Sequence, residues 1–342
     1  MKLAKWVFSV LAASLLALTG TQANAQSRSS SGAEPPTVPD LVADAYRWGD
    51  FAELERLYAI YGKAGVRSEL TGHPRLDHFW MGIGMINDSS LRVTDDYYEQ
   101  LDALTKRWAL DHPRSVLAQL LYASTLETRA WVYRGNGYAH TVSPAGWAGF
   151  RKYRDLALAQ LQRTEAMAAN DSSWNEIALR VGRSLDWDKA RLMAVFQRGI
   201  AKNPDHDTLY FSMLTALLPK WGGDLEGIDR FIALADRNTR ERRDLQMYAR
   251  LYAALSYEEL DQALFTSSRA SWTGMKEGFE DLLKRYPHVD HRNMYAYFAC
   301  MADDRQVLRE QLQSIGDTFV RKFWGGNADR TFEACRRMAA QL

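Results

Sequence analysis

The chain has 342 residues, enough for one large domain or two ordinary ones with a substantial hydrophobic core. Its 43 basic and 42 acidic residues nearly balance, which argues against a nucleic-acid-binding protein or one held on anionic membranes. Aromatic side chains are abundant, with 11 Trp, 16 Tyr and 13 Phe, and in helical proteins they mostly fill the gaps between helices.

Residues 1–25 have the three parts of a secretory signal peptide. Lys2 and Lys5 form a basic start, and the apolar stretch that follows, from Trp6 to Leu18, is too short to span a membrane. A small-x-small sequence then ends at Ala25, where we expect cleavage. We predict a soluble mature protein that is periplasmic or secreted, with no membrane insertion after signal cleavage.

Residues 26–39 are rich in Ser and Pro and are predicted to form a disordered leader, because this composition cannot bury a core. From Asp40 onward, apolar residues recur at three- and four-residue spacing, the period of an amphipathic helix. Gly, Pro and Asn-Asp sequences divide these runs as far as the C-terminus, and no alternating strand pattern occurs. The sequence therefore predicts one all-α helical-repeat domain over 40–342, with about fourteen helices, mostly in antiparallel pairs.

The stretch Pro219-Lys220-Trp221-Gly222-Gly223-Asp224 is suited to joining two helices. Pro219 disfavours helix at the preceding residue, the glycines readily adopt positive φ, and Asp224 can cap the next helix. A second copy, Trp324-Gly325-Gly326, lacks the proline and has Asn327 in the capping position. We interpret both copies as structural joints, with Trp221 packed into the groove between neighbouring helices.

A weak repeat runs through the middle of the chain. Asn170-Asp171 and Asn203-Pro204-Asp205 lie 33 residues apart, close to the period of tetratricopeptide repeats. Phe196, Gly199 and Pro204 match the aromatic, small and proline positions of that repeat, which place two residues on one helix face and then stop the helix. The prediction is a tetratricopeptide-like α–α superhelix. The alternative is a set of helical pairs that share these breaks by chance.

Four segments carry a resemblance to a known family: Ala130-Trp131 with Arg134-Gly135, the helix start from Trp147 to Phe150, the stretch 217–223, and the stretch 299–305. Together they resemble a bacterial family named only as a domain of unknown function, with a Leu-Pro-Lys/Arg-Trp-Gly-Gly motif. That family has Ser after the glycines, where this chain has Asp224. The resemblance covers most of the mature chain. It implies a tetratricopeptide-like helical fold and no assigned activity, so no catalytic residue is carried over.

Cys300 and Cys335 are the two cysteines of the chain. An oxidising compartment favours a disulfide between them, which would stabilise the fold by about 3–4 kcal/mol through loop closure. The alternative is a pair of buried thiols, made unreactive by apolar neighbours.

The sequence contains no nucleophile elbow, Walker loop or dinucleotide-binding fingerprint, and we predict no cofactor. His288-Val289-Asp290-His291 could bring two imidazoles to one helix turn, as metal sites do. Its position directly after Pro287 favours a polar helix start instead, and no metal site is predicted. The segment from Arg237 to Arg243 is interleaved with acids, which favours a solvated helix face over a phosphate-binding patch.

These features favour binding over catalysis. We expect an exported scaffold or adaptor that binds another protein or peptide in the cell envelope, with an immunity-type inhibitor as one form of it. Its contacts are expected on an extended concave face and to include Trp174, Tyr210, Tyr248 and Tyr252, although aromatic residues also suit the core.

The alternative function is an envelope hydrolase or glycan-active enzyme. It would need an aromatic cleft that brings together His73, Asp77 and His78, the histidines and acid that lie close in sequence.

Overall fold

The computed structural model describes residues 36–88, 95–135 and 137–341, and the regular elements in these ranges are helical. The all-α fold is thereby confirmed. The predicted signal peptide and residues 26–35 of the leader lie outside the described residues. The region expected to be one domain forms two compact units: unit 1 is Met1–Val66 with Pro74–Leu185, and unit 2 is Arg67–His73 with Asp186–Leu342.

Unit 1 is built around α6, which packs against α5, α7 and α8, while α2 packs against α3 and α4. Its first helix begins at Val38, two residues before the expected start, because Thr37 and Asp40 cap it with reciprocal hydrogen bonds. The elements are α2 (Val38–Arg47), α3 (Phe51–Tyr61), α4 (Arg75–Asn87), α5 (Asp95–Asp111), α6 (Val116–Arg134), the 3₁₀ turn η1 (Ala139–Thr141), α7 (Pro144–Ala168) and α8 (Ser172–Ser184).

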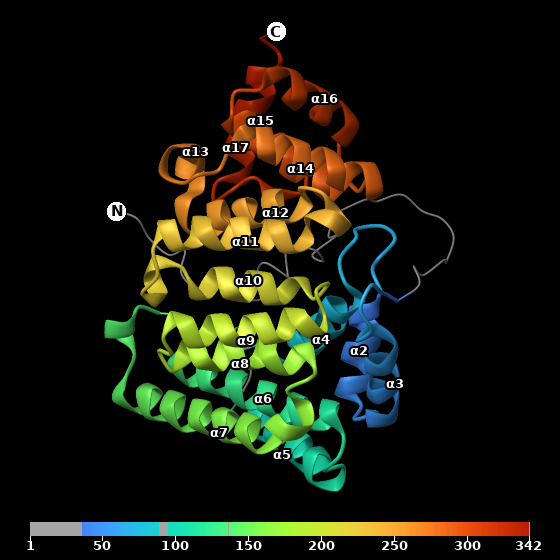
Figure 1. Cartoon of the computed structure of the whole chain (residues 1–342), viewed down its shortest axis with the longest axis vertical. Coiled ribbons are helices and arrows are strands. Elements are labelled where there is room, and N and C mark those ends of the chain that lie inside the picture. Colours follow the sequence, from blue (N-terminus) through green and yellow to red (C-terminus); the bar gives the residue numbers. More distant parts are fainter. Residues whose placement is uncertain (1–35, 89–94, 136, 342) are drawn as a thin grey trace. The chain divides into compact units, whose positions relative to one another are not determined.

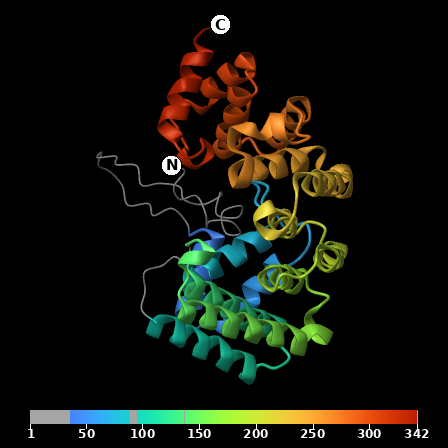
Figure 2. The same ribbon diagram turned by 90° about the vertical axis from the view of Figure 1, so that its left-hand side faces the viewer.

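In unit 2 each major helix packs against the next in the chain, from α9 to α17 (Figures 1 and 2). The elements are α9 (Lys189–Lys202), α10 (Asp207–Ala216), η2 (Pro219–Trp221), α11 (Leu225–Arg243), α12 (Gln246–Leu255), η3 (Ser256–Leu260), η4 (Asp261–Ala263), α13 (Leu264–Ser267), α14 (Trp272–Arg285), α15 (Val289–Met301), α16 (Arg305–Ile315), η5 (Arg321–Phe323) and α17 (Ala328–Ala339).

The repeat positions of the sequence are core positions of unit 2. Phe196 is fully buried, and its ring centroid lies 5.2 Å from those of Tyr210 on α10 and Phe231 on α11. Gly199, one turn later, is also buried. The aromatic residue thus fixes α9 against the two helices that follow it, and burying such a ring contributes about 1.5–3 kcal/mol.

The first Trp-Gly-Gly joint follows α10. Its backbone makes a 3₁₀ turn, Gly222 has φ +72°, and Asp224 caps α11 by accepting a hydrogen bond of 2.6 Å from the amide of Gly227. The predicted cap is confirmed. Gly223 is required for another reason: a Cβ there would lie 1.8 Å from the carbonyl oxygen of Leu217.

The second joint begins directly after the 3₁₀ turn η5, and Gly325 has φ +73°. Asn327 stands at the N-cap position of α17, as expected, but its side chain makes no capping hydrogen bond. Trp324 is completely buried, and its indole N–H donates to Oδ1 of Asn293 at 2.9 Å.

The π-helical turn η3, which continues α12, contacts the first joint and the 3₁₀ turn just before the second. Lys220 of the first joint forms a 3.2 Å ion pair with Glu258, and the Tyr257 hydroxyl donates to the carbonyl of Phe323. A π-turn of this kind is uncommon in helices. Here it contacts two segments that are about a hundred positions apart in the sequence.

The two cysteines lie on helices near the C-terminus. Cys300 on α15 and Cys335 on α17 form a disulfide, as predicted, with their Cα atoms 5.7 Å apart.

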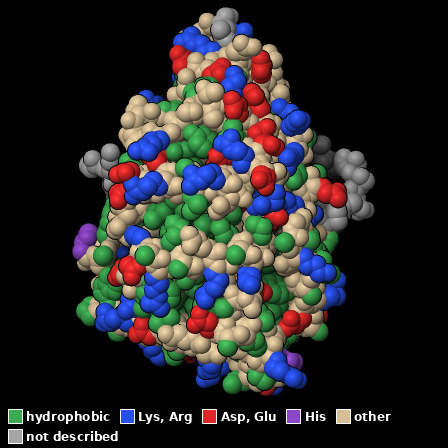
Figure 3. Space-filling model, viewed as in Figure 1, with side chains coloured by type: hydrophobic (Ala, Val, Ile, Leu, Met, Phe, Trp, Pro, Cys, Tyr) green, Lys and Arg blue, Asp and Glu red, His purple; other side chains and the backbone are tan. Residues whose placement is uncertain are grey.

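Within the described ranges, no helix combines the length and apolar character needed to cross a bilayer. On the face drawn in Figure 3, acidic and basic side chains are interspersed, as the balanced composition leads one to expect.

Candidate functional site

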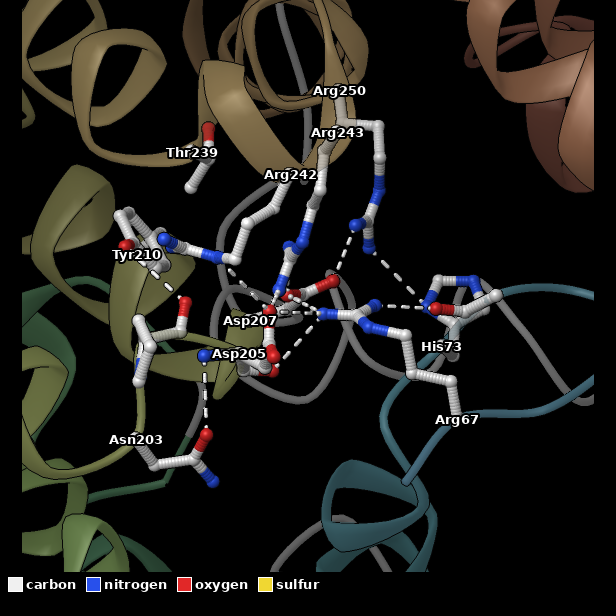
Figure 4. A network of polar contacts seen from close by, with 12 residues as sticks. Arg67, His73, Asn203, Asp205, Asp207, Tyr210, Thr239, Arg242, Arg243 and Arg250 are labelled. Atoms are coloured by element: carbon white, nitrogen blue, oxygen red, sulfur yellow. Dashed lines mark hydrogen bonds and ion pairs between the residues drawn. The ribbon is translucent and has the colours of Figure 1, made fainter. Parts of the chain in front are cut away.

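A network of polar side chains in unit 2 surrounds the start of α10 (Figure 4). We call it the arginine–aspartate cluster, and it consists of Arg67, Asp205, Asp207, Arg243 and Arg250. Asp207 is the first residue of α10, with Asp205 just ahead of it. Arg243 is the last residue of α11, and Arg250 lies within α12. Arg67 comes from the segment Arg67–His73, which we call the strap.

Three guanidinium groups converge on the carboxylate of Asp207. Arg67 and Arg243 both donate to Oδ1, the former at 3.1 Å, while Arg250 donates to Oδ2. Oδ1 of Asp205 accepts from Arg243 at 2.5 Å and from Arg67 at 3.4 Å. The cluster therefore joins the strap, α10, α11 and α12 through charge-assisted hydrogen bonds, which are the stronger class.

Burial makes these pairings important for stability. The side chain of Asp207 is 0% exposed, and those of Arg243 and Arg250 are largely covered. Removing one partner of a buried ion pair leaves an uncompensated charge and costs about 3–5 kcal/mol. A change of Asp207 would leave three guanidinium groups without their shared acceptor.

Arg242 forms the outer edge of this cluster. Its side chain is 40% exposed, and its Nε lies 3.8 Å from Oδ1 of Asp205, the longest ion pair of the group. One Nη group donates to the carbonyl of Asn238 within α11. This guanidinium is thus held in place by its own helix while much of it faces solvent.

The strap is fixed by further contacts within unit 2. Arg250 donates from Nη2 to Nδ1 of His73 at 3.2 Å, and Arg67 donates to the carbonyl of Gly72. The imidazole of His291 on α15 donates from Nε2 to the carbonyl of Thr71 at 3.0 Å, since a carbonyl can only accept. Gly72 has φ +69°, and a Cβ there would lie 2.3 Å from the ring of Tyr286.

Arginine is always a donor, so Nδ1 of His73 must carry a lone pair, and His73 is neutral in this arrangement. Two nearby histidines are also neutral. Burial lowers the pKa of His206 to about 4, although Asp207 acts in the opposite direction. Burial, reinforced by Arg250, lowers the pKa of His291 to about 3. His206 and His291 therefore act as neutral imidazoles near pH 7.

Three of the four aromatic residues expected at a binding face are buried. The Trp174 indole donates to the carbonyl of Leu161 in unit 1. In unit 2 the Tyr210 ring packs on Phe196, and the Tyr252 hydroxyl donates to Asp229 at 2.8 Å. Large aromatic rings gain more free energy in the core than on the surface, so these three are core residues and not surface contacts.

The fourth, Tyr248, is half-buried. Its ring centroid lies 4.8 Å from that of Tyr252, and its hydroxyl accepts a hydrogen bond from the amide of Ser271 at 3.0 Å. It is the one member of the predicted set with part of its side chain at the surface.

The residues of the enzyme alternative belong to different units. His73 is the last residue of the strap in unit 2, whereas Asp77 and His78 lie in the first turns of α4 in unit 1. Asp77 and His78 are both buried. Burial, reinforced by Arg75, lowers the pKa of His78 to about 4.

A second buried ionic cluster lies in unit 1. Arg180 on α8 pairs with Glu127 on α6 at 3.0 Å and with Glu176, one turn earlier on its own helix, at 3.2 Å. The indole N–H of Trp131 donates to the other oxygen of Glu127 at 2.8 Å. The spacing of Glu127 and Trp131, four residues apart, was visible in the sequence, but the partnership with Arg180 was not predicted.

The basic segment at the end of α11 was predicted to be a solvated face, and this interpretation is wrong for Arg243. Arg243 turns inward to Asp205 and Asp207, although Arg240 and Arg242 remain exposed. The sequence offered one signal, because Asp205-His206-Asp207 places two acids at a helix start. It gave no indication that Arg67 would join them.

The segment His288-Val289-Asp290-His291 was predicted to be a polar helix start and not a metal site. His288 is the N-cap of α15, and its Nδ1 accepts from the amide of Asp290 at 3.2 Å, so the helix-start interpretation is confirmed. Across the ranges that the structure describes, no group of three or more His, Cys, Asp or Glu side chains is arranged to hold a metal ion.

Residues 43–203 match the family model of a domain of unknown function, DUF4034. The predicted resemblance to an uncharacterised family of this kind is confirmed over that range. The match includes the strap and the Glu127–Arg180 cluster, and it ends before Asp205 and the first Trp-Gly-Gly joint. Comparison with curated proteins and with solved structures finds no match.

Proposed function

We propose that this protein is an exported helical-repeat scaffold or adaptor that binds another protein in the cell envelope and has no catalytic activity. The proposal combines the predicted signal peptide with the successive packed helices of unit 2, since helical repeats commonly present extended binding faces. The observation that carries it is the exposed outer edge of the arginine–aspartate cluster, at Arg242.

Two physical arguments support a binding role for this edge. Arginine is enriched among the residues that dominate the free energy of protein–protein binding, because its planar group makes several directed hydrogen bonds. The guanidinium of Arg242 is half-exposed and only loosely paired, so a carboxylate on a partner can approach it. The inner groups already donate to and accept from one another, which suits a rigid platform more than proton transfer.

The test is affinity capture from the native envelope with the mature protein and two charge-reversal variants on the same helix. Arg242→Glu removes the proposed contact. Arg230→Glu is the matched control, because Arg230 is exposed and pairs with Glu226 one turn away on the same helix. We expect capture of a reproducible partner to fall about tenfold in the first variant and to change by less than about twofold in the second.

The variants must keep the melting temperature of the parent, which thermal unfolding checks directly. If the purified protein turns over a glycan or ester substrate while no partner is captured, the binding proposal is wrong and the hydrolase alternative takes its place. If both variants lose the partner equally, the contact does not lie at Arg242.

A further inference from the structure

The strap combines strong attachment with one contact that depends on protonation. Its own backbone closes a turn, in which the amide of Ser68 donates to the carbonyl of His73 and the amide of Gly72 donates to that of Ser68, both at 2.8 Å. Arg67 anchors the first end to Asp205 and Asp207. The last end is held where Nδ1 of His73 accepts from Arg250.

We propose that His73 makes the last end of the strap a pH-responsive latch, which stays closed while the imidazole is neutral and opens when Nδ1 takes up a proton, while Arg67 keeps the first end attached. A proton at Nδ1 removes the acceptor and places an N–H against the N–H of Arg250. It also adds a positive charge beside a guanidinium, so a hydrogen bond is replaced by repulsion. Histidine is the side chain whose charge ordinarily changes between pH 5 and 8.

The groups around His73 favour this response. Arg250 faces it from α12, and the ring of His291 on α15 lies 6.2 Å away, centroid to centroid. Asp207 on α10, which binds the same Arg250, also accepts from Arg67 and Arg243. Its carboxylate is therefore shared among three guanidinium groups.

The sign of the pH effect follows from the neutral form being the bound form. Attachment of the His73 end of the strap weakens as the pH falls, because uptake of a proton at Nδ1 disfavours the closed form. His206 and His291 do not contribute between pH 7.5 and 5.5, because their pKa values of about 4 and 3 lie below this range. His288, the N-cap of α15, has its ring centroid 6.0 Å from that of His291, and a His288→Asn variant controls for it.

Hydrogen exchange measured by mass spectrometry on the full mature chain tests the latch. The reporters are the amides of Ser68 and Gly72, with a peptide from α16 as an internal control. After correction for the intrinsic pH dependence of exchange, we expect protection of the strap to fall about tenfold between pH 7.5 and 5.5. Protection of α16 should not change.

Two amide variants separate the proton from the shape of the ring. In His73→Asn the side-chain oxygen occupies the place of Nδ1 and accepts from Arg250 without titrating, so the strap should stay protected at both pH values. In His73→Gln the oxygen reaches the place of Nε2 instead, so protection should be low at both. The proposal fails if the wild type is equally protected at both pH values, or if the Asn variant loses protection in acid as the wild type does. The latch concerns the isolated protein, so this outcome is independent of whether a partner is found.

Discussion

The two Trp-Gly-Gly joints have the same three residues but different surroundings. Each is associated with a 3₁₀ turn, which ends at Trp221 in the first joint and at Phe323, just before Trp324, in the second. Their first glycines have nearly equal φ values, +72° and +73°. Trp221, however, is half-buried, whereas Trp324 is 0% exposed and hydrogen-bonded to Asn293. Asp224 caps the following helix, and Asn327 does not. The tripeptide therefore specifies the turn, and the neighbouring helices decide how much each residue contributes to stability.

The largest difference is expected between the two tryptophans. Trp324→Ala should lower the free energy of unfolding by about 3–5 kcal/mol, since it leaves a large cavity and removes one of the two hydrogen bonds that Oδ1 of Asn293 accepts, the other coming from the amide of Val320. Trp221→Ala should cost about 1–2 kcal/mol, in keeping with its partial burial. Denaturant unfolding of both variants measures this. Equal losses of unfolding free energy in the two variants would mean that the exposed fraction of the tryptophan does not determine its contribution to stability.

Gly223, the second glycine of the first joint, is expected to show the next largest loss of stability on substitution. Gly223→Ala would force a methyl group onto the carbonyl oxygen of Leu217, so the backbone must move, at a cost of about 2–3 kcal/mol. Gly227→Ala is a matched control on α11, because the nearest atom to its Cβ is a side-chain oxygen of Asp224 at 3.2 Å. Thermal unfolding should show a clearly lower midpoint for Gly223→Ala than for Gly227→Ala. A midpoint equal to that of the parent would contradict the close approach.

The first glycines should respond almost alike. Gly222→Ala has open space around the new Cβ, so its cost is that of the positive φ, about 1 kcal/mol. Gly325→Ala has the same φ and adds a contact of 3.3 Å with the Tyr297 hydroxyl, which can shift slightly. Stability measurements on both variants should agree within about 0.5 kcal/mol. A large gap would show that the two turns differ in more than their tryptophans.

The smallest effects are expected at the caps. Asp224→Ala removes the hydrogen bond to Gly227 and should cost about 1 kcal/mol. Asn327→Ala should change stability by less than about 0.5 kcal/mol, because no capping bond is lost. Hydrogen exchange in the first turns of α11 and α17 compares the two caps directly. Faster exchange in α17 of the Asn327→Ala variant than in the parent would show that Asn327 does cap the helix in solution.

The sequence predicted features whose free energy comes from residues close together in the chain. Helix starts at Ser143, Asp171 and Asp224 follow from a polar side chain that can accept from an amide two or three residues ahead. The all-α class follows from hydrophobic periodicity. The disulfide was predicted because the chain has two cysteines and an apparent export signal, which leaves one intramolecular pairing.

Tertiary structure decided which polar and aromatic residues turn inward. In the sequence, Tyr210 and Tyr252 cannot be told from surface tyrosines. The packing of α10 against its neighbouring helices buries Tyr210, and Tyr252 is buried beside Asp229, to which its hydroxyl donates. Arg243 stands in a segment of mixed charge that resembles a solvated face. Its burial depends on acids that lie 36 and 38 positions earlier.

The strap shows this limit most clearly. Arg250 and His73 are 177 positions apart, and Arg67 reaches Asp205 across 138 positions. No local pattern encodes such a pairing, because its free energy arises only when distant charges are desolvated together in the folded chain. The sequence by itself determined helices, turns and the cysteine pair, through short-range hydrogen bonds and periodicity. The tertiary fold decided that residues 67–73 belong to unit 2. It also decided that the tryptophans of the two Trp-Gly-Gly joints are buried to different extents, so that we expect them to contribute unequally to stability.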